Sequence, residues 1–159
     1  MESFYILFLD IDGVLHRPWD LPETTSLDEH VNKFSQQAVN NLNTIIETIR
    51  SRTGKPVYVI LSSSWRRYGD LPRLREIFKQ WPFAGLIIDK TPMFTIPNRP
   101  IEIMERLNVW KNTHNVLGYV VLDDYPEGMG VFGDKFVKVS ERNLLTEEDA
   151  RRAVAALLS

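Results

Sequence analysis

Two aspartates in D-x-D spacing follow an apolar run near the beginning of the chain. Residues 4–9 read FYILFL, and the segment continues through Asp10 and Asp12 to Gly13. Because side chains alternate along an extended chain, both aspartates lie on one side and Ile11 turns to the other. Two neighbouring carboxylates repel each other, and a bound cation removes this repulsion. The spacing therefore indicates a cation site, beside which Gly13 allows the backbone to turn sharply.

The sequence D-x-D-G also begins the calcium-binding loop of EF-hand proteins. That loop needs a glutamate at its twelfth position, and counting from Asp10 places Leu21 there. The EF-hand interpretation is therefore excluded. A single aspartate at a strand end is more often a turn former or a helix cap, so the prediction depends on the pair.

Polar residues follow two further apolar runs. Residues 57–61 (VYVIL) precede the serines 62–64, and residues 119–122 (YVVL) precede Asp123 and Asp124. Because ligands of open α/β sheets bind beyond the carboxyl ends of the strands, we expect these side chains and the D-x-D pair to meet at one edge. Four carboxylates there would need a divalent cation, and oxygen ligands favour Mg²⁺ over zinc. The sequence thus predicts a magnesium site.

The elements that must position these residues alternate between strands and helices. Continuous apolar runs are typical of strands buried on both faces, and helical spacing of apolar residues separates them. The predicted strands are residues 4–9, 57–61, 86–88, 119–122 and 136–139, and the predicted helices are residues 35–52, 71–81, about 100–110 and from Thr146 onward. This alternation predicts a three-layer α/β sandwich with a parallel sheet of about five strands.

The organisation of the chain is that of one domain over residues 1–159. Residues 16–34, which are polar and rich in proline, predict a loop, flap or small lid inserted after the first strand. The chain has no cysteine, which excludes disulfides, thiolate zinc sites and a cysteine nucleophile. No apolar run is long enough to span a membrane, and the N-terminus does not resemble a signal peptide, so we expect a cytoplasmic protein.

The charge balance gives no general attraction to nucleic acids. The formal net charge is -2, and the best candidate for a local basic patch is residues 62–79, SSSWRRYGDLPRLREIFK.

The three ordered segments LFLDIDGVL, VYVILSSS and YVVLDD resemble the first, second and fourth motifs of the haloacid dehalogenase (HAD) superfamily. The finer pattern DIDGVLH, LSSSWR and LDD, followed by LLTEEDA, is similar to the small HAD domain of Swiss Army Knife RNA repair proteins. The resemblance extends over most of the chain. It implies a HAD-like Rossmannoid fold without a large cap and a phosphatase activity.

The resemblance also implies roles for single residues. Asp10 would be the nucleophile that takes the phosphoryl group as an aspartyl-phosphate. Asp12 would protonate the leaving oxygen and later deprotonate the attacking water. Ser62 and the backbone N–H of Ser63 would bind phosphoryl oxygens.

The same resemblance implies the ligands of the magnesium ion. These are the carboxylate of Asp10, the backbone carbonyl of Asp12 and one acid of the fourth motif. Either Asp123 or Asp124 could be that ligand. The other would contact the ion through a water molecule or interact with one of the direct ligands.

The cation of the third motif departs from the superfamily pattern, in which a lysine lies near the start of the helix before the fourth strand. Here that position reads NRPIEIMERL. Arg99 is the first choice, because a guanidinium can bridge a carboxylate and a phosphate. Lys90, which follows the third predicted strand, is the alternative.

Three further residues are candidates for substrate binding. Trp65 and Arg66 begin the expected helix after the serines, where an aromatic ring beside an arginine would suit a nucleobase or a phosphotyrosine. His16 could reach the substrate from the flap. Each also has a plainer interpretation, as a core residue for Trp65 and as a turn residue for His16.

Taken together, the motifs predict a magnesium-dependent phosphomonoesterase. The short insertion after the first strand leaves the site open, which favours a macromolecular substrate such as a nucleic-acid end or a phosphoprotein. The alternatives are a non-catalytic module that binds a phosphorylated partner, and a phosphotransferase. The oligomeric state stays open, with a monomer plausible.

Overall fold

The computed structural model describes residues 2–159 and contains one parallel sheet of five strands in the order β3-β2-β1-β4-β5. The strands are β1 (Ser3–Leu9), β2 (Val57–Leu61), β3 (Ile87–Lys90), β4 (Asn115–Asp123) and β5 (Phe136–Lys138). The sheet order places β1 in the centre, so its neighbours β2 and β4 both end beside it. The predicted α/β class with a five-stranded parallel sheet is confirmed.

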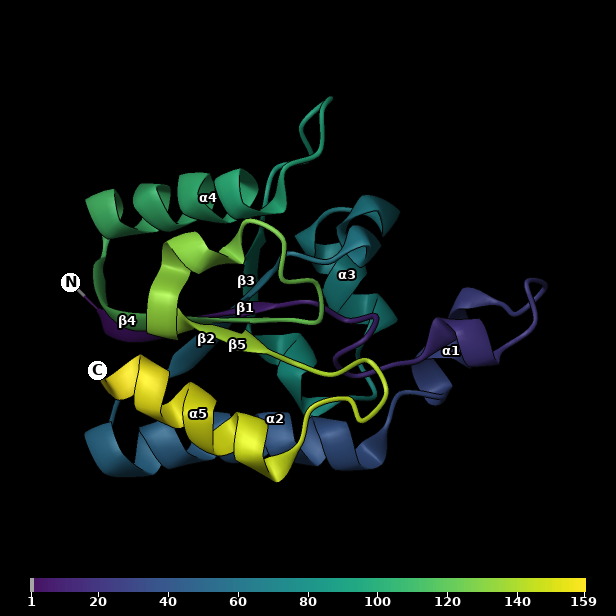
Figure 1. The fold of residues 1–159 in the computed structure, drawn as a ribbon, viewed down its shortest axis with the longest axis horizontal. Coiled ribbons are helices and arrows are strands. Elements are labelled where there is room, and N and C mark those ends of the chain that lie inside the picture. The colour runs from purple at the N-terminus through teal and green to yellow at the C-terminus, as the bar shows by residue number, and fades with distance from the viewer. Residues whose placement is uncertain (1) are drawn as a thin grey trace.

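Helices cover both faces of the sheet and make three layers (Figure 1). The helix α4 lies over one face, α2 and α5 lie over the other, and α3 runs beside β3. The helices are α1 (Leu27–Asn32), α2 (Gln36–Thr53), α3 (Leu71–Ile77), α4 (Arg99–Thr113) and α5 (Glu147–Leu158), and short 3₁₀ helices are found at Pro18–Asp20, Ser64–Tyr68, Pro82–Leu86 and Met129–Lys135. No helix within residues 2–159 is long and apolar enough to cross a membrane.

The central strand β1 is buried on both faces, which explains its uninterrupted apolar run. Phe4, Ile6 and Phe8 join the core under α4, whereas Tyr5, Leu7 and Leu9 join the larger core under α2 and α5. The backbone N–H of Asp10 still donates to the carbonyl of Leu122, so the extended pairing continues one residue past the strand.

The ends of α2 and α5 follow the signals in their sequences. The side chain of Ser35 accepts a hydrogen bond from the N–H of Ala38, and Gly54 ends α2 in the left-handed conformation. Thr146 and Asp149 form a reciprocal capping box at the start of α5. These caps fix the length of the two helices that lie under the sheet.

The helix expected over residues 71–81 ends earlier, at Ile77. Phe78 and Trp81 are buried, but they reach the core from turns and not from further helix. Phe78 and Trp81 are three residues apart, and side chains at this spacing can face the same side in a turn as well as in a helix. The apolar spacing therefore predicted a longer helix than the structure has.

The segment 16–34, predicted as a loop, flap or lid, contains the short helix α1. Ser26 caps this helix by accepting from the N–H of Glu29, and Val31 is buried in the core. The indole N–H of Trp81 donates to the carbonyl of Val31 at 2.9 Å and ties the helix to the body of the protein. In Figure 1, α1 lies at the right, beyond the carboxyl ends of the strands.

The close approach of α5 to β4 at Gly118 gives a test of the packing. A Cβ atom at Gly118 would lie 2.3 Å from the backbone oxygen of Leu157, so Gly118→Ala forces the helix away from the strand. We expect the free energy of unfolding to fall by about 1–3 kcal/mol in urea denaturation. Gly85→Ala is the control, because a Cβ at Gly85 meets nothing within 4 Å. Equal stability of the two variants would contradict this packing.

Candidate functional site

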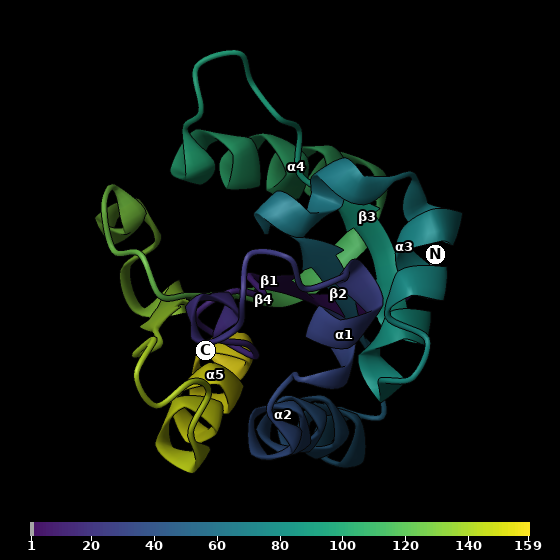
Figure 2. The ribbon, with the colours of Figure 1, turned by 90° about the vertical axis from the view of Figure 1, so that its right-hand side faces the viewer.

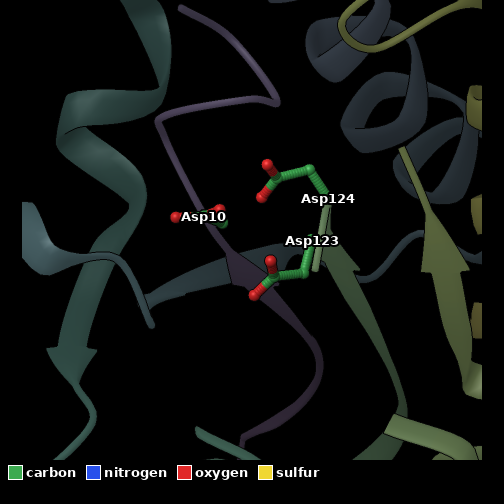
Figure 3. A group of neighbouring side chains, drawn as sticks. All are labelled: Asp10, Asp123 and Asp124. Atoms are coloured by element: carbon green, nitrogen blue, oxygen red, sulfur yellow. The ribbon is translucent and has the colours of Figure 1, made fainter. Parts of the chain in front are cut away.

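Three carboxylates gather at the carboxyl edge of the sheet (Figure 3). Asp10 follows β1, Asp123 is the last residue of β4, and Asp124 comes next. Leu9 and Leu122 are paired in the sheet, so the residues after them are neighbours. One oxygen from each carboxylate lies within 4.8 Å of the others, and these three side chains could hold a metal ion.

The electrostatics of this cluster favour a further positive charge. Burial raises the pKa of Asp10 well above its usual value, and the neighbouring charge of Asp123 raises it further. Burial also raises the pKa of Asp124. Arg99 opposes the shift at Asp10, but it supplies one charge against three acids. A hard, oxygen-seeking divalent cation fits this set of donors.

Arg99, the first residue of α4, reaches the cluster. Its Nη1 lies 2.8 Å from Oδ2 of Asp123 and 3.4 Å from Oδ1 of Asp10. Burial lowers the pKa of Arg99, but the charges of Asp123 and Asp10 outweigh that effect and raise it. The side chain of Asn98 caps the helix by accepting from the N–H of Ile101, which fixes where α4 begins.

Lys90, the other candidate for this cation, is bound elsewhere in the structure. Its Nζ donates to the backbone carbonyls of Arg66 at 3.1 Å and Gly69 at 2.7 Å. The ammonium thus joins the end of β3 to the connection that follows β2. Of the two candidates, it is Arg99 that the structure brings to the carboxylates.

Asp12 is held by Trp65. The indole Nε1–H donates to Oδ1 of Asp12 at 2.9 Å, and the tryptophan ring is buried against Phe34 and Phe78. The ring therefore belongs to the core, as the plainer interpretation had it, and its polar edge orients Asp12. The side chain of Asp12 is not part of the three-carboxylate group.

Ser62 and Ser63 are both fully buried but differ in their partners. Within residues 2–159, the Oγ of Ser62 has no hydrogen-bond partner. The Oγ of Ser63 instead accepts from the N–H of Trp65 and caps the 3₁₀ helix that follows. Because a buried hydroxyl without a partner is costly, the Ser62 side chain fits a donor to a ligand oxygen.

The absence of a side chain at Gly13 makes room for the carboxylate of Asp124. A Cβ atom at this position would lie 2.3 Å from Oδ2 of Asp124, and the backbone has a φ of +85°. The glycine after the D-x-D pair is thus required for two reasons, a left-handed turn and the space that the carboxylate occupies.

His16 lies in the protein interior. Its Nε2 is 2.8 Å from Nδ1 of His30 on α1, and its ring packs against Phe34. Burial lowers the pKa of His16, although the charge of Asp12 opposes the shift. The histidine pair joins the first residue of the flap to α1.

Arg66 is also buried, where it pairs with Glu102, a residue that the sequence analysis did not identify. Nη2 of Arg66 lies 2.9 Å from Oε1 of Glu102, and Nη1 donates to the carbonyl of Ser62 at 2.6 Å. Oε2 of Glu102 accepts from the N–H of Phe94. This pair joins α4 to the connections after β2 and β3. The only sequence signal was an acid between two isoleucines, three residues after Arg99.

Burial lowers the pKa of Arg66, and the opposite charge of Glu102 partly restores it. Both side chains are less than a tenth exposed. If one partner were removed, water could not solvate the charge of the other. The pair is therefore a structural link behind the carboxylate site.

The comparison with protein-family models agrees with the motifs. The family model described as "HAD domain in Swiss Army Knife RNA repair proteins" matches residues 6–150. A solved crystal structure is similar with a TM-score of 0.41 and 18% identity, over 97% of this chain and 81% of the other. No curated protein gives a significant match. The matched region includes all of the carboxylates at the sheet edge.

Breaking the Arg66–Glu102 pair tests its structural role. Glu102→Ala leaves the Arg66 charge buried and unpaired, so we expect a loss of about 3–5 kcal/mol in the free energy of unfolding. The double variant Arg66→Met/Glu102→Leu should recover most of it, since no buried charge remains. Urea denaturation of the two variants measures both effects.

The exposed pair Lys79–Glu76 provides the matched control, and Glu76→Ala should leave stability nearly unchanged. A double variant as unstable as Glu102→Ala would argue against the assignment of the loss to an unpaired charge.

Proposed function

The chain belongs to the family of HAD domains found in Swiss Army Knife RNA repair proteins, and from this membership we propose that it is a magnesium-dependent phosphomonoesterase. In this proposal Asp10 takes the phosphoryl group as an aspartyl-phosphate. The substrate is a phosphorylated macromolecule, which enters at the open edge of the sheet.

The placement of Asp10 is the observation that carries the proposal. Its Oδ1 accepts from the N–H of Ile11 at 3.0 Å and faces Arg99, which leaves Oδ2 to attack phosphorus. An anionic nucleophile approaches an anionic phosphate only where positive charge neutralises both. Arg99 supplies part of that charge.

The carboxylates of Asp10 and Asp124, with the backbone carbonyl of Asp12, would hold the magnesium ion. We assign the direct contact to Asp124 because both oxygens of Asp123 already accept hydrogen bonds, from Arg99 and from the N–H of Tyr125. When bound, the ion supplies positive charge to the phosphoryl oxygens.

The first step forms a bond between Oδ2 of Asp10 and phosphorus while the ester P–O bond breaks. Asp12 gives its proton to the leaving oxygen. Because Trp65 occupies Oδ1 of Asp12, this proton is carried on Oδ2. The hydroxyl of Ser62 and the guanidinium of Arg99 bind phosphoryl oxygens as charge develops on them.

The second step regenerates the enzyme. Asp12, now ionised, takes a proton from water, and the oxygen of that water attacks phosphorus. The bond between phosphorus and Asp10 breaks, inorganic phosphate leaves, and Asp12 is again protonated. No oxidant or reductant takes part.

Two features support a macromolecular substrate. Within the described residues, the insertion after β1 contributes only the 3₁₀ turn Pro18–Asp20 and the short helix α1, which is too little to enclose the edge as a large cap would. The family description names RNA repair proteins, which favours a nucleic-acid end over a phosphoprotein.

Asp10→Asn tests the nucleophile. We expect the wild-type protein to hydrolyse phosphomonoesters in the presence of Mg²⁺ and to lose this activity in excess chelator. The variant should lose at least about a thousandfold in kcat, because the amide cannot form the acyl-phosphate. Phosphate release, measured on a panel of phosphorylated oligonucleotides, phosphopeptides and nucleotides, detects both effects.

Asp134→Asn, at an exposed aspartate, is the control for loss of one negative charge. Full activity in Asp10→Asn would refute the mechanism. Binding of phosphate without turnover of any substrate would favour a non-catalytic module, and capture of the phosphoryl group by added alcohols would identify a phosphotransferase.

Arg99→Ala and Lys90→Ala compare the two candidate cations. Arg99 contacts the carboxylates of Asp10 and Asp123, so we expect its loss to lower kcat/KM by about 10²- to 10³-fold. Lys90 bonds to backbone carbonyls, so its loss should change kcat/KM by less than about tenfold. Steady-state kinetics on one substrate measure both, and the reverse ranking would make Lys90 the catalytic cation.

A further inference from the structure

The exposed aromatic side chains of the described residues all lie on connections that leave the edge of the sheet carrying the carboxylates. Among residues 2–159, the exposed aromatics are Trp19 (50% exposed), Tyr68 (38%), Phe94 (38%) and Tyr125 (57%). They belong to four different connections, which follow β1, β2, β3 and β4 in that order. Figure 2 looks onto this edge, with these connections around the ends of the strands.

Exposed aliphatic side chains are distributed differently. Val109 on α4, Leu117 in β4 and Leu158 in α5 are exposed on other parts of the surface. Met93, Ile96 and Val131 are also exposed, on the connections after β3 and β4, so among residues 2–159 only the aromatic rings are confined to these connections. Exposed apolar groups collected in one place indicate a binding surface.

Two of the rings have an arginine beside them. The guanidinium carbon of Arg67 lies 4.7 Å from the ring centre of Tyr68, and that of Arg17 lies 5.9 Å from the ring centre of Trp19. Arg17 is already paired with Asp20, whereas Arg67 donates to the hydroxyl of Tyr68 and to a backbone carbonyl. Arg67 thus offers a charge to a phosphodiester next to a ring that can stack.

We propose that Trp19, Tyr68, Phe94 and Tyr125 form an aromatic rim on which the unpaired bases of a single-stranded nucleic-acid end stack, while its terminal phosphate lies at Asp10. This inference rests on the proposed phosphomonoesterase and names the substrate of that same site. Stacking on aromatic rings tolerates any base, because every base has a flat π face.

The surface fits unpaired bases better than the other macromolecules. A duplex hides the faces of all but its terminal base pair, so it could not stack on several of these rings. A phosphopeptide would gain from aliphatic neighbours, but among the described residues the connections that carry Trp19 and Tyr68 expose no large aliphatic side chain. The arginines beside Trp19 and Tyr68 suit bases joined by phosphodiesters.

The test compares two substrates that share a phosphate but differ in their bases. One is a single-stranded oligonucleotide phosphorylated at its 5′ or 3′ end, and the other is glycerol phosphate, which has no ring. For Tyr68→Leu/Phe94→Leu we expect the ratio of the two kcat/KM values to fall at least about tenfold, since each lost stack weakens binding by roughly that factor.

Matched variants separate the ring from other properties of these side chains. Tyr68→Phe keeps the ring and should preserve the ratio of kcat/KM values. Val109→Ala removes an exposed aliphatic group on α4 and should also preserve it.

A binding measurement makes the test independent of turnover. Fluorescence anisotropy of the labelled oligonucleotide compares the Asp10→Asn protein with the same protein that also carries Tyr68→Leu and Phe94→Leu. The Kd should be at least about tenfold higher for the second protein. If the wild-type protein hydrolyses nothing but this difference in Kd is found, the rim stands and the phosphatase proposal fails.

The rim is overturned by an unchanged ratio together with an unchanged Kd. It is equally overturned if a blunt duplex is as good a substrate as the single strand. Preference for phosphopeptides that depends on the same rings would assign the surface to a protein partner instead.

Discussion

The burial of like charges at the ends of two paired strands is the constraint on which the rest of the structure depends. Asp10 and Asp123 are adjacent because β1 and β4 are adjacent, and water cannot screen them there. Arg99 balances part of this charge from outside the sheet. Three carboxylates placed this way could hold a metal ion, and in the proposed function that positive charge would attract the phosphate.

The helix α4 transmits this constraint to the neighbouring connections. Its first turn presents Arg99 to the carboxylates and Glu102 to Arg66, while Ile103 anchors it in the core. Arg66 in turn holds the carbonyl of Ser62. The positions of Arg99 and of Ser62, whose hydroxyl has no hydrogen-bond partner within residues 2–159, are thus linked through the buried pair of Arg66 and Glu102. A shift of α4 would disturb both.

At the sheet edge, the residues proposed for catalysis and those proposed for substrate recognition lie on different elements. The groups assigned to phosphoryl transfer lie at strand ends and at the first turn of α4, where the core fixes them. The aromatic rim lies on the connections, whose sequences can change without disturbing the sheet. This division explains how a small domain without a large cap could still select a substrate.

The sequence by itself determined the five strands and their parallel arrangement, because these follow from the periodicity of apolar residues and from the alternation of strands with helices. It also identified Arg99 and Lys90 as the two candidate cations. Only the tertiary structure decided which of them meets the carboxylates, since that depends on where the start of α4 lies relative to β1 and β4.

The same holds for Trp65 and Glu102. A tryptophan beside an arginine is compatible with a binding surface or with the core, and an acid on a helix usually faces water. Their actual roles depend on partners 53 and 36 residues away in sequence, Asp12 and Arg66. No local pattern encodes such contacts, because they exist only once the sheet has brought its connections together.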